Sequence, residues 1–481
     1  MQKSKFISVL RQLRHEEMAE FAKFLKQYHK KDKTALRVFQ YVYAHFPDFN
    51  HPNLSLELAY PEIYNTPLPE SPLETKNRLA KKLLNKLSEL SLWLEDFLWH
   101  QKISKPSAEK DLIWATILIE RNLYPELSKH RLSLKKNLTQ ILPEDIPGYL
   151  NLMVASYLTN YHSAELARDT DPNMFPDFIK SLDSFYAVTR LKLACEMETR
   201  KRVKPETVTN GESPFSWSNL MALLPPDQVQ NQPLLAIYSE LFLLITENSH
   251  SSYEKVETIL KENLDRIAQK EQYDILVFLQ NYTARQIRRG NRAYLKIAHN
   301  LNVFGVDQGF FTKDGTISAN HYTSIITAGC KANALDWVKD FAKVYSLKLE
   351  PNIREEATKL GEATIQFGMA NYTEVLSILQ NHYFSDTHCE IRSRSLIMMS
   401  IWELKETAKY IQKYSLAFEQ YLINRYKKDK SSIIVASLNF VRIFKKIASG
   451  SKDKPELITE IESLELLFFR EWLLQQARRL P

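Results

Sequence analysis

The stretch KNRLAKKLLNKLSELSLWLEDFLWHQ, residues 76–101, carries the strongest helix signal in the chain. Its apolar positions alternate three and four apart, at Ala80, Leu83, Leu87, Leu90, Leu94 and Phe97. This spacing is a heptad seam, which lines one face of a helix with apolar side chains. Four further apolar residues widen the stripe beyond a two-stranded seam: Leu79, Leu84, Trp93 and Leu98. The pattern favours a core helix of an N-terminal module, and a dimerising coiled coil is the alternative.

The low glycine content predicts helices along the whole chain, not only over residues 76–101. Only ten of the 481 residues are glycine, about 2% against a usual share of roughly 7%. Tight turns between strands and loops that bind phosphate both need glycine. Since apolar residues recur at helical spacing almost everywhere, the sequence predicts an all-α protein without a nucleotide-binding fold.

Cysteine usage and hydropathy indicate the compartment. The three cysteines, Cys195, Cys330 and Cys389, form no CxxC pair and lie far apart, which favours reduced thiols. The apolar stretch Phe6–Leu10 is too short for the core of a signal sequence, so we do not expect secretion. The most apolar segment, Leu234–Ile245, falls well short of the roughly 20 residues that span a bilayer. We therefore expect a cytoplasmic protein without a membrane segment.

Helical periodicity divides the chain at two clusters of breakers. Helices are predicted at 4–13, 16–29, 32–46, 72–101, 107–122, 146–165, 175–202, 233–247, 252–268, 270–289 and 291–301. Val203–Pro233 is rich in proline, and Asn302–Ser318 contains three glycines. We expect an N-terminal helical module over 1–101, a helical middle region over 102–232, and a helical-hairpin array over 233–481.

After residue 318 the spacing predicts a repeat of about 35 residues; the alternative is a series of amphipathic helices of similar length, which gives some such alignments without a repeat. Helix starts are predicted near 318, 352, 387 and 430. Shifting the chain by this period aligns three sets of apolar residues: Ala332, Phe367 and Trp402; Phe341, Leu376 and Ile411; Val344, Leu379 and Tyr414. Repeats of this length are typical of helical-hairpin solenoids, in which each hairpin buries its apolar face against the next.

The segment REEATKLGEATIQFGMANYTEVLSILQ, Arg354–Gln380, resembles a tetratricopeptide hairpin, with Leu360 and Gly361 in its first helix and Tyr372 opening its second. The resemblance covers about residues 320–425. It implies a TPR-like α-solenoid that binds a peptide or a protein. We expect Tyr322, Trp337, Tyr345, Tyr372 and Trp402 to pack inside the hairpins rather than to contact a ligand.

Basic residues form four clusters, and the charge is concentrated at the ends of the chain. Residues 1–40 carry ten Lys and Arg against four acids, and residues 421–481 carry twelve against seven. The clusters are Lys81, Lys82 and Lys86; Arg200, Lys201 and Arg202; Arg285, Arg288, Arg289 and Arg292; and Arg425, Lys427 and Lys428. Three of them fall at predicted helix C-termini, where positive charge stabilises the macrodipole. Binding to nucleic-acid phosphates is the alternative.

Two groupings have the residue types of a metal site. His382, Asp386, His388 and Cys389 are possible zinc ligands, but a turn between helices explains their polarity equally. Pro47 and Asp48 with Glu74 and Lys76 match a loose nuclease pattern, whereas Glu74 also suits the first turn of a helix. We favour the structural reading for both, and no GxxxxGK, GxSxG, HExxH or GxGxxG motif occurs.

These observations favour a non-enzymatic helical scaffold that binds a protein or peptide partner, without catalytic, cofactor-binding or metal-binding residues. The first alternative is a regulator that contacts nucleic acid through its basic termini. The second is a structural subunit that self-assembles as a homo-oligomer. The apolar segment Leu464–Leu474, which we expect to form the last helix, either docks inside the molecule or recruits a second copy.

Overall fold

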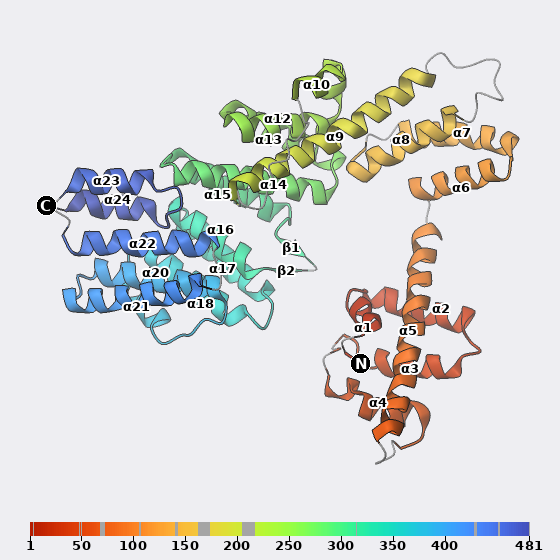
Figure 1. Cartoon of the computed structure of the whole chain (residues 1–481), viewed down its shortest axis with the longest axis horizontal. Coiled ribbons are helices and arrows are strands. Elements are labelled where there is room, and N and C mark those ends of the chain that lie inside the picture. Colours follow the sequence, from red (N-terminus) through yellow and green to blue (C-terminus); the bar gives the residue numbers. More distant parts are fainter. Residues whose placement is uncertain are drawn as a thin grey trace. The chain divides into compact units, whose positions relative to one another are not determined.

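The computed structural model confirms the all-α class (Figure 1). It describes the whole chain except residues 3, 48, 50, 68–72, 105–106, 140–142, 162–173, 204–216, 314, 428–430, 451–452 and 481. The described residues contain 24 α-helices and one hairpin of two-residue strands. The chain forms two compact units, Met1–Gln140 with Val154–Thr170, and Ile141–Met153 with Asp171–Pro481. We call them unit 1 and unit 2.

Unit 1 is organised around one long helix, α5 (Leu73–Ser104). The helices packed on it are α1 (Lys5–Leu10), α2 (His15–Tyr28), α3 (Lys33–Tyr43) and α4 (Leu56–Tyr64). Leu83, Leu87, Leu90, Leu94 and Phe97 of α5 are all buried in the shared core. The heptad seam is therefore filled by helices of the same chain, as the core-helix reading predicts.

The rest of unit 1 is a smaller helical group. The helices α6 (Ala108–Glu120) and α7 (Tyr124–Thr139) pack on each other and share a core with Ala155 of α8 (Ile146–Tyr161). Neither α4 nor α7 was expected from periodicity. Pro61 inside α4 and the polar sequence of α7 weaken the pattern that would have revealed these two helices.

Unit 2 begins with helices on both sides of the proline-rich connection predicted over Val203–Pro233. Residues 204–216 of that connection lie outside the described residues. The remainder contains two short helices, α10 (Trp217–Ala222) and α11 (Pro226–Asn231), which the prediction missed. Proline is compatible with the first turn of a helix, so Pro226 begins α11 rather than preventing it.

Helices then follow in antiparallel neighbours down to the C-terminus. They are α9 (Met174–Val203), α12 (Pro233–Glu247), α13 (His250–Glu262), α14 (Gln269–Arg288), α15 (Ala293–Asp307), α16 (Ala319–Lys331), α17 (Leu335–Tyr345), α18 (Arg354–Gly368), α19 (Tyr372–Leu379), α20 (Thr387–Glu403), α21 (Ala408–Tyr426), α22 (Ser432–Ala448), α23 (Lys454–Ser463) and α24 (Arg470–Arg479). The helix α16 packs on α17 and α18, and α18 packs on α19 and α20. Helices α16, α18, α20 and α22 begin within two residues of the four starts predicted for the array.

The three aligned apolar sets differ in how well their members match. Phe341 and Ile411 are buried on α17 and α21, and the second helix of each hairpin supplies them. Leu379 is also buried, but its aligned partner Val344 is 52% exposed. The third set therefore does not occupy one common environment.

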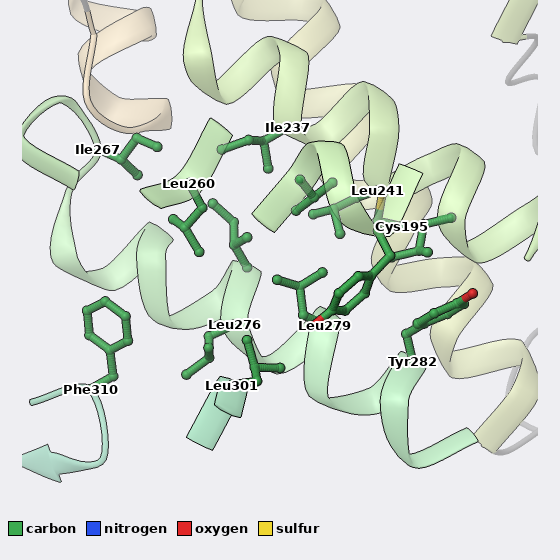
Figure 2. Close-up of a cluster of buried hydrophobic side chains, with 14 of the residues drawn as sticks. Cys195, Ile237, Leu241, Leu260, Ile267, Leu276, Leu279, Tyr282, Leu301 and Phe310 are labelled. Atoms are coloured by element: carbon green, nitrogen blue, oxygen red, sulfur yellow. The ribbon is translucent and has the colours of Figure 1, made fainter. Parts of the chain in front are cut away.

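The N-terminal half of unit 2 has a large apolar core. Figure 2 shows Ile237 and Leu241 of α12, Leu276 and Leu279 of α14, and Leu301 of α15 converging in it. All five side chains are 1% exposed or less. Such burial contributes roughly 1.5–3 kcal/mol for each large aliphatic side chain.

A buried ion pair crosses this core. Lys192 Nζ of α9 lies 2.8 Å from Glu271 Oε1 and 2.9 Å from Asp274 Oδ2 of α14. The Tyr238 hydroxyl of α12 donates to Glu271 Oε2 at 2.5 Å. Burial disfavours the charged form of Lys192, but its bonds to the two carboxylates outweigh that effect and raise its pKa. Burial and the Glu271 charge raise the pKa of Tyr238. This network joins α9, α12 and α14.

The predicted break over Asn302–Ser318 is wrong in its first part, since α15 continues to Asp307. Gly305 is buried within that helix, where an added Cβ would lie 2.5 Å from Phe311 Cε2 and 2.8 Å from Leu276 Cδ2. This glycine permits close packing and does not end the helix. After it, β1 (Thr312–Lys313) pairs antiparallel with β2 (Thr316–Ile317), and Gly315 between them has a φ of +77°.

Close approach explains two more of the few glycines. Gly361 of α18 faces α16, where an added Cβ would lie 2.8 Å from Ile326 Cδ1 and 2.9 Å from Tyr322 Cε1. At Gly329 of α16 an added Cβ would overlap Val338 Cγ2 of α17. Glycine therefore lets α16 approach both of its neighbours.

The expected last helix, Leu464–Leu474, is also wrong. The chain turns at Phe469, whose φ of +52° is left-handed, and α24 starts only at Arg470. The Arg470 guanidinium is buried and donates to the carbonyls of Ile461, Glu462 and Leu464. It therefore caps the end of α23, and the two segments form a hairpin whose apolar side chains join the core of α18–α24.

We predict that Glu271→Gln lowers the free energy of opening of α14 by about 2 kcal/mol, because Lys192 and the Tyr238 hydroxyl lose a charged acceptor in the core. Hydrogen exchange of α14 amides measures this. The control is Glu355→Gln, whose pair with Lys359 is exposed and screened by solvent, so the protection of α14 should not change. Equal protection in both variants would contradict the structural role of the network.

The raised pKa values of Lys192 and Tyr238 predict a loss of stability in alkali. The folded state keeps both protons to higher pH than the unfolded state, whose groups titrate near 10. Their stabilisation is complete below about pH 10 and falls as the pH rises further. In Tyr238→Phe, the stability of unit 2 should decline less steeply, by about one proton, between about pH 10 and 11. Denaturant unfolding at several pH values gives the slopes, and identical slopes would refute the assignment.

We predict that Gly329→Ala destabilises unit 2 by about 1–3 kcal/mol, because the new methyl group overlaps Val338. Adding Val338→Ala removes the overlapping atoms, so the double variant should recover part of the loss. Thermal unfolding of the two single variants and the double variant gives the coupling energy. Strict additivity would mean that the two positions do not clash.

Candidate functional site

The C-terminal helix returns to a much earlier part of unit 2. Arg292 Nε, between α14 and α15, lies 2.8 Å from Glu471 Oε2 in the first turn of α24. Glu403 at the end of α20 accepts hydrogen bonds from Trp472 Nε1 at 2.8 Å and from Gln476 Nε2 at 2.7 Å. These contacts bring α14, α20 and α24 together, although the Arg292 pair spans 179 residues of sequence.

The helix α20 is surrounded by protein for most of its length. Eleven of its seventeen residues are buried, on every side of the helix, as the serines Ser393, Ser395 and Ser400 illustrate. Charged residues on such a helix need partners, because transfer of an unpaired charge from water is costly. Glu390 meets this need: it accepts from Arg394 Nε at 2.6 Å and from the Phe384 amide at 3.2 Å.

Arg392 on the same helix has no such acid. Its Nη1 donates to Thr323 Oγ1 of α16 at 3.1 Å, and Thr323 itself is buried. In the described part of the chain, no carboxylate lies within 4.0 Å of the Arg392 guanidinium. Burial lowers its pKa, which shows that the charged form is held in an unfavourable environment. A guanidinium has five N–H donors, and Thr323 accepts from only one of the two Nη atoms.

Lys331, the last residue of α16, is a second cation in the same region. Its side chain reaches solvent, but the dense protein around it lowers its pKa, and the positive charge of Arg392 lowers it further. The negative charge of Glu471 acts in the opposite direction. Among the described residues, Lys331 also has no carboxylate within 4.0 Å, since Glu471 is paired with Arg292. We call Lys331, Arg392 and Thr323 the Lys331–Arg392 site.

Positive and negative charges both act on the ionisable groups of α20 and α24. Burial lowers the pKa of His388, one turn before Arg392; the Arg392 charge lowers it further and Asp386 acts in the opposite direction. Burial also lowers the pKa of Arg470, whereas the charges of Glu462 and Glu471 raise it.

A shallow groove of about 670 Å³ lies elsewhere in unit 2, between α19 and the start of α21. Thr373, Leu376, Ser377 and Gln380 form one side, and Glu406, Thr407 and Tyr410 form the other. The groove is open and of mixed polarity. Its one charged residue, Glu406, has no cationic neighbour in the lining, so the groove offers no arrangement for chemistry.

Several residues of the predicted basic clusters have partners within their own unit. Lys86 pairs with Asp32 at 2.6 Å and Glu89 at 2.7 Å. Lys201 pairs with Glu198 at 2.6 Å in the last turn of α9. The Arg285–Arg292 cluster lies at the end of α14, as expected, and Arg292 forms an ion pair with Glu471. Arg425 lies over the Tyr421 ring in α21, and Lys428 is outside the described residues.

The possible zinc ligands near residue 385 have separate roles. Asp386 is the N-cap of α20 and accepts from the Cys389 amide at 2.9 Å. His382 Nδ1 lies 3.3 Å from Lys359 Nζ. Cys389 is buried, and burial raises the pKa of its thiol to about 12. Within the described ranges, no three His, Cys, Asp or Glu side chains are grouped to hold a metal ion.

The nuclease-like pattern is placed only in part. Asp48 lies outside the described residues, and Glu74 is in the first turn of α5, on a helix and not on a strand.

The aromatic residues predicted to pack do so. Tyr322 is 1% exposed with its ring 5.8 Å from Phe341, and Trp402 lies 5.6 Å from Phe444.

Sequence reasoning missed both cations of the Lys331–Arg392 site. The signal for Arg392 was the segment CEIRSRSLIMMSIW, in which apolar and small residues leave no polar face. A helix of this kind is buried all round, so its two arginines required partners. Lys331 had no signal of its own, since a lysine ending a helix usually stabilises the terminus.

Comparison with known proteins gives no family for this chain. No family model matches it, and no match is found among curated proteins or solved structures. Across the described helices, none combines the length and apolar character needed to cross a membrane. The candidate function therefore rests on the arrangement of residues in unit 2.

Proposed function

We propose that this chain is a non-enzymatic scaffold of the cytoplasm that binds a partner protein through the helical hairpins of unit 2. The observation that carries the proposal is the consecutive packing of α16, α18 and α20, as in stacked hairpins. Arg392 of α20 donates to Thr323 of α16 and has no carboxylate within 4.0 Å in the described chain. A partner that carries an anionic group would neutralise this charge.

A TPR-like α-solenoid is the finer architecture that we propose. Its support is the order of contacts, since α16, α18 and α20 pack in sequence while α17 and α19 pack beside the next hairpin. The position of Gly361, at the close approach of α18 to α16, also suits the tetratricopeptide resemblance. In solenoids the stacked repeats create one extended concave binding surface.

The contacts of the basic residues favour a protein partner over nucleic acid. Near the C-terminus, Lys445 pairs with Glu419 at 2.7 Å and Lys446 with Glu460 at 2.6 Å. Near the N-terminus, Lys5 pairs with Glu95. Phosphates would have to compete with these carboxylates. Self-assembly is less favoured, because the apolar residues Leu467, Leu473 and Leu474 are already buried in the core.

We predict that a photo-crosslinking residue, benzoylphenylalanine, in place of the exposed Arg288 captures one partner protein in the native host. Arg288 is exposed in the last turn of α14, and its charge acts on Arg470 at the start of α24. The control position is Leu347, which is 73% exposed on the 3₁₀ helix η4 (Ser346–Lys348). Mass spectrometry identifies the adducts, and light scattering of the purified chain gives its own mass.

The proposal expects a protein adduct at Arg288 that is absent at Leu347. An adduct with nucleic acid would favour the first alternative, and an adduct of twice the chain mass would favour self-assembly. Equal adducts at both positions, or none, would contradict binding through this surface.

A further inference from the structure

The long helix α9, yellow in Figure 1, has apolar side chains on two opposite faces. One face lies in the core of unit 2 and contains Ala187, Val188, Leu191 and Cys195. The other face carries five large apolar side chains that are 41–60% exposed: Phe175, Ile179, Leu182, Tyr186 and Leu193. We call these five residues the α9 stripe. A helix that is apolar on all sides is normally buried on all sides, but in the described chain only the first face is covered.

The spacing of the α9 stripe is that of a helix–helix contact. Its members follow one another at steps of four, three, four and seven residues. Alternating steps of three and four keep side chains in one line along a helix, and such a line packs against a second helix. At a rise of about 1.5 Å per residue the stripe is about 27 Å long. Covering it requires an element as long as a helix.

Polar contacts on the buried side fix the rotation of α9 about its own axis. Gln228 Nε2 donates to Ser184 Oγ at 2.7 Å and to the Lys180 carbonyl at 3.2 Å. Lys192 pairs with Glu271 at 2.8 Å. A rotation that turned the α9 stripe toward the core would break these bonds. The stripe therefore has to be covered from outside the core of unit 2.

The area of the α9 stripe corresponds to one side of a dimer interface. A fully exposed large apolar side chain presents about 150–250 Å², so the five half-exposed members offer about 450 Å² on each copy. Two copies would bury about 900 Å² from these residues alone. The partly exposed Phe178 and Phe185 of the same helix extend the contact toward the range of about 1,200–2,000 Å² that stable interfaces bury. A monomer rarely leaves an apolar patch of this size open.

Every copy of the chain carries the same α9 stripe, so two α9 helices related by a two-fold axis would cover both stripes in one contact. We propose that two copies of this chain associate through the α9 stripe. The contact is separate from the segment Leu464–Leu474, in which Leu467, Leu473 and Leu474 are buried. The inference goes beyond the proposed function, because a dimer presents two partner-binding arrays in one assembly.

Sedimentation equilibrium of the full chain tests the dimer over about 1–100 μM, since interfaces of this size hold complexes at micromolar or lower concentrations. The variants Ile179→Glu and Tyr186→Glu each place a carboxylate within the α9 stripe. The matched control is Leu347→Glu, because Leu347 is an apolar residue that is 73% exposed on η4.

The native chain and Leu347→Glu should have twice the mass of one chain. Ile179→Glu and Tyr186→Glu should each weaken association more than about tenfold, because the interface would bury an unpaired carboxylate from each copy. The circular dichroism of both variants should stay helical, since the replaced side chains are about half exposed. A native chain with the mass of one copy throughout the range would overturn the inference, and so would a dimer that neither variant weakens.

Photo-crosslinking locates the contact even if a glutamate variant fails to fold. Benzoylphenylalanine replaces Leu182 in one preparation and Leu347 in the control, each as an equal mixture of isotopically heavy and light chains. We expect an adduct between a heavy and a light chain at position 182, joined to α9 of the second copy, and none at position 347. An adduct within one chain, an adduct to residues outside α9, or no adduct would contradict the proposed contact.

The two proposals can fail separately. A monomeric chain that captures a partner at Arg288 would keep the scaffold function and lose only the dimer. A dimer through α9 that captures no partner at Arg288 would keep this inference and lose the scaffold function.

Discussion

The return of α24 onto α20 is the contact on which the architecture of the C-terminal half depends. Glu403 accepts from the Trp472 indole and the Gln476 amide, and the Trp402 indole donates to Gln476 Oε1 at 3.1 Å. Four polar groups are satisfied within one short interface, in a region where unsatisfied groups would be costly. These bonds hold the end of α20, while α18, α19 and α21 pack along the rest of it, so that most of the residues of α20 are buried.

A helix buried on all sides imposes a partner on each of its charged residues. Glu390 and Arg394 satisfy one another, four residues apart on the same helix. Arg392 reaches across to α16 and finds a neutral hydroxyl. These two arginines, two positions apart on one helix, therefore differ in whether an acid of the same helix neutralises them. A methionine or a leucine in place of Arg392 would fill the core without burying a charge.

Several glycines lie at close contacts between helices, a role that the composition of the sequence does not indicate. Its scarcity correctly indicated helices, because few tight turns occur among the described residues. Several of the few that remain are packing devices: Gly305, Gly329 and Gly361 lie inside helices where a side chain would collide with a neighbour. The expectation that glycines mark breaks therefore failed at Gly305, since close approach decided its role.

The sequence by itself determined the secondary-structure class, the starts of the four helices α16, α18, α20 and α22, and the burial of the α5 seam. These features follow from the local spacing of apolar side chains, which is a property of neighbours along the chain. The short or polar helices α4, α7, α10 and α11 and the turn at Phe469 depend on contacts with distant residues, so local patterns did not reveal them. The Lys331–Arg392 site belongs to the same category. Lys331 and Arg392 lie 61 positions apart in the sequence, on two different helices. Whether either cation has an acidic partner is decided only when the helices pack.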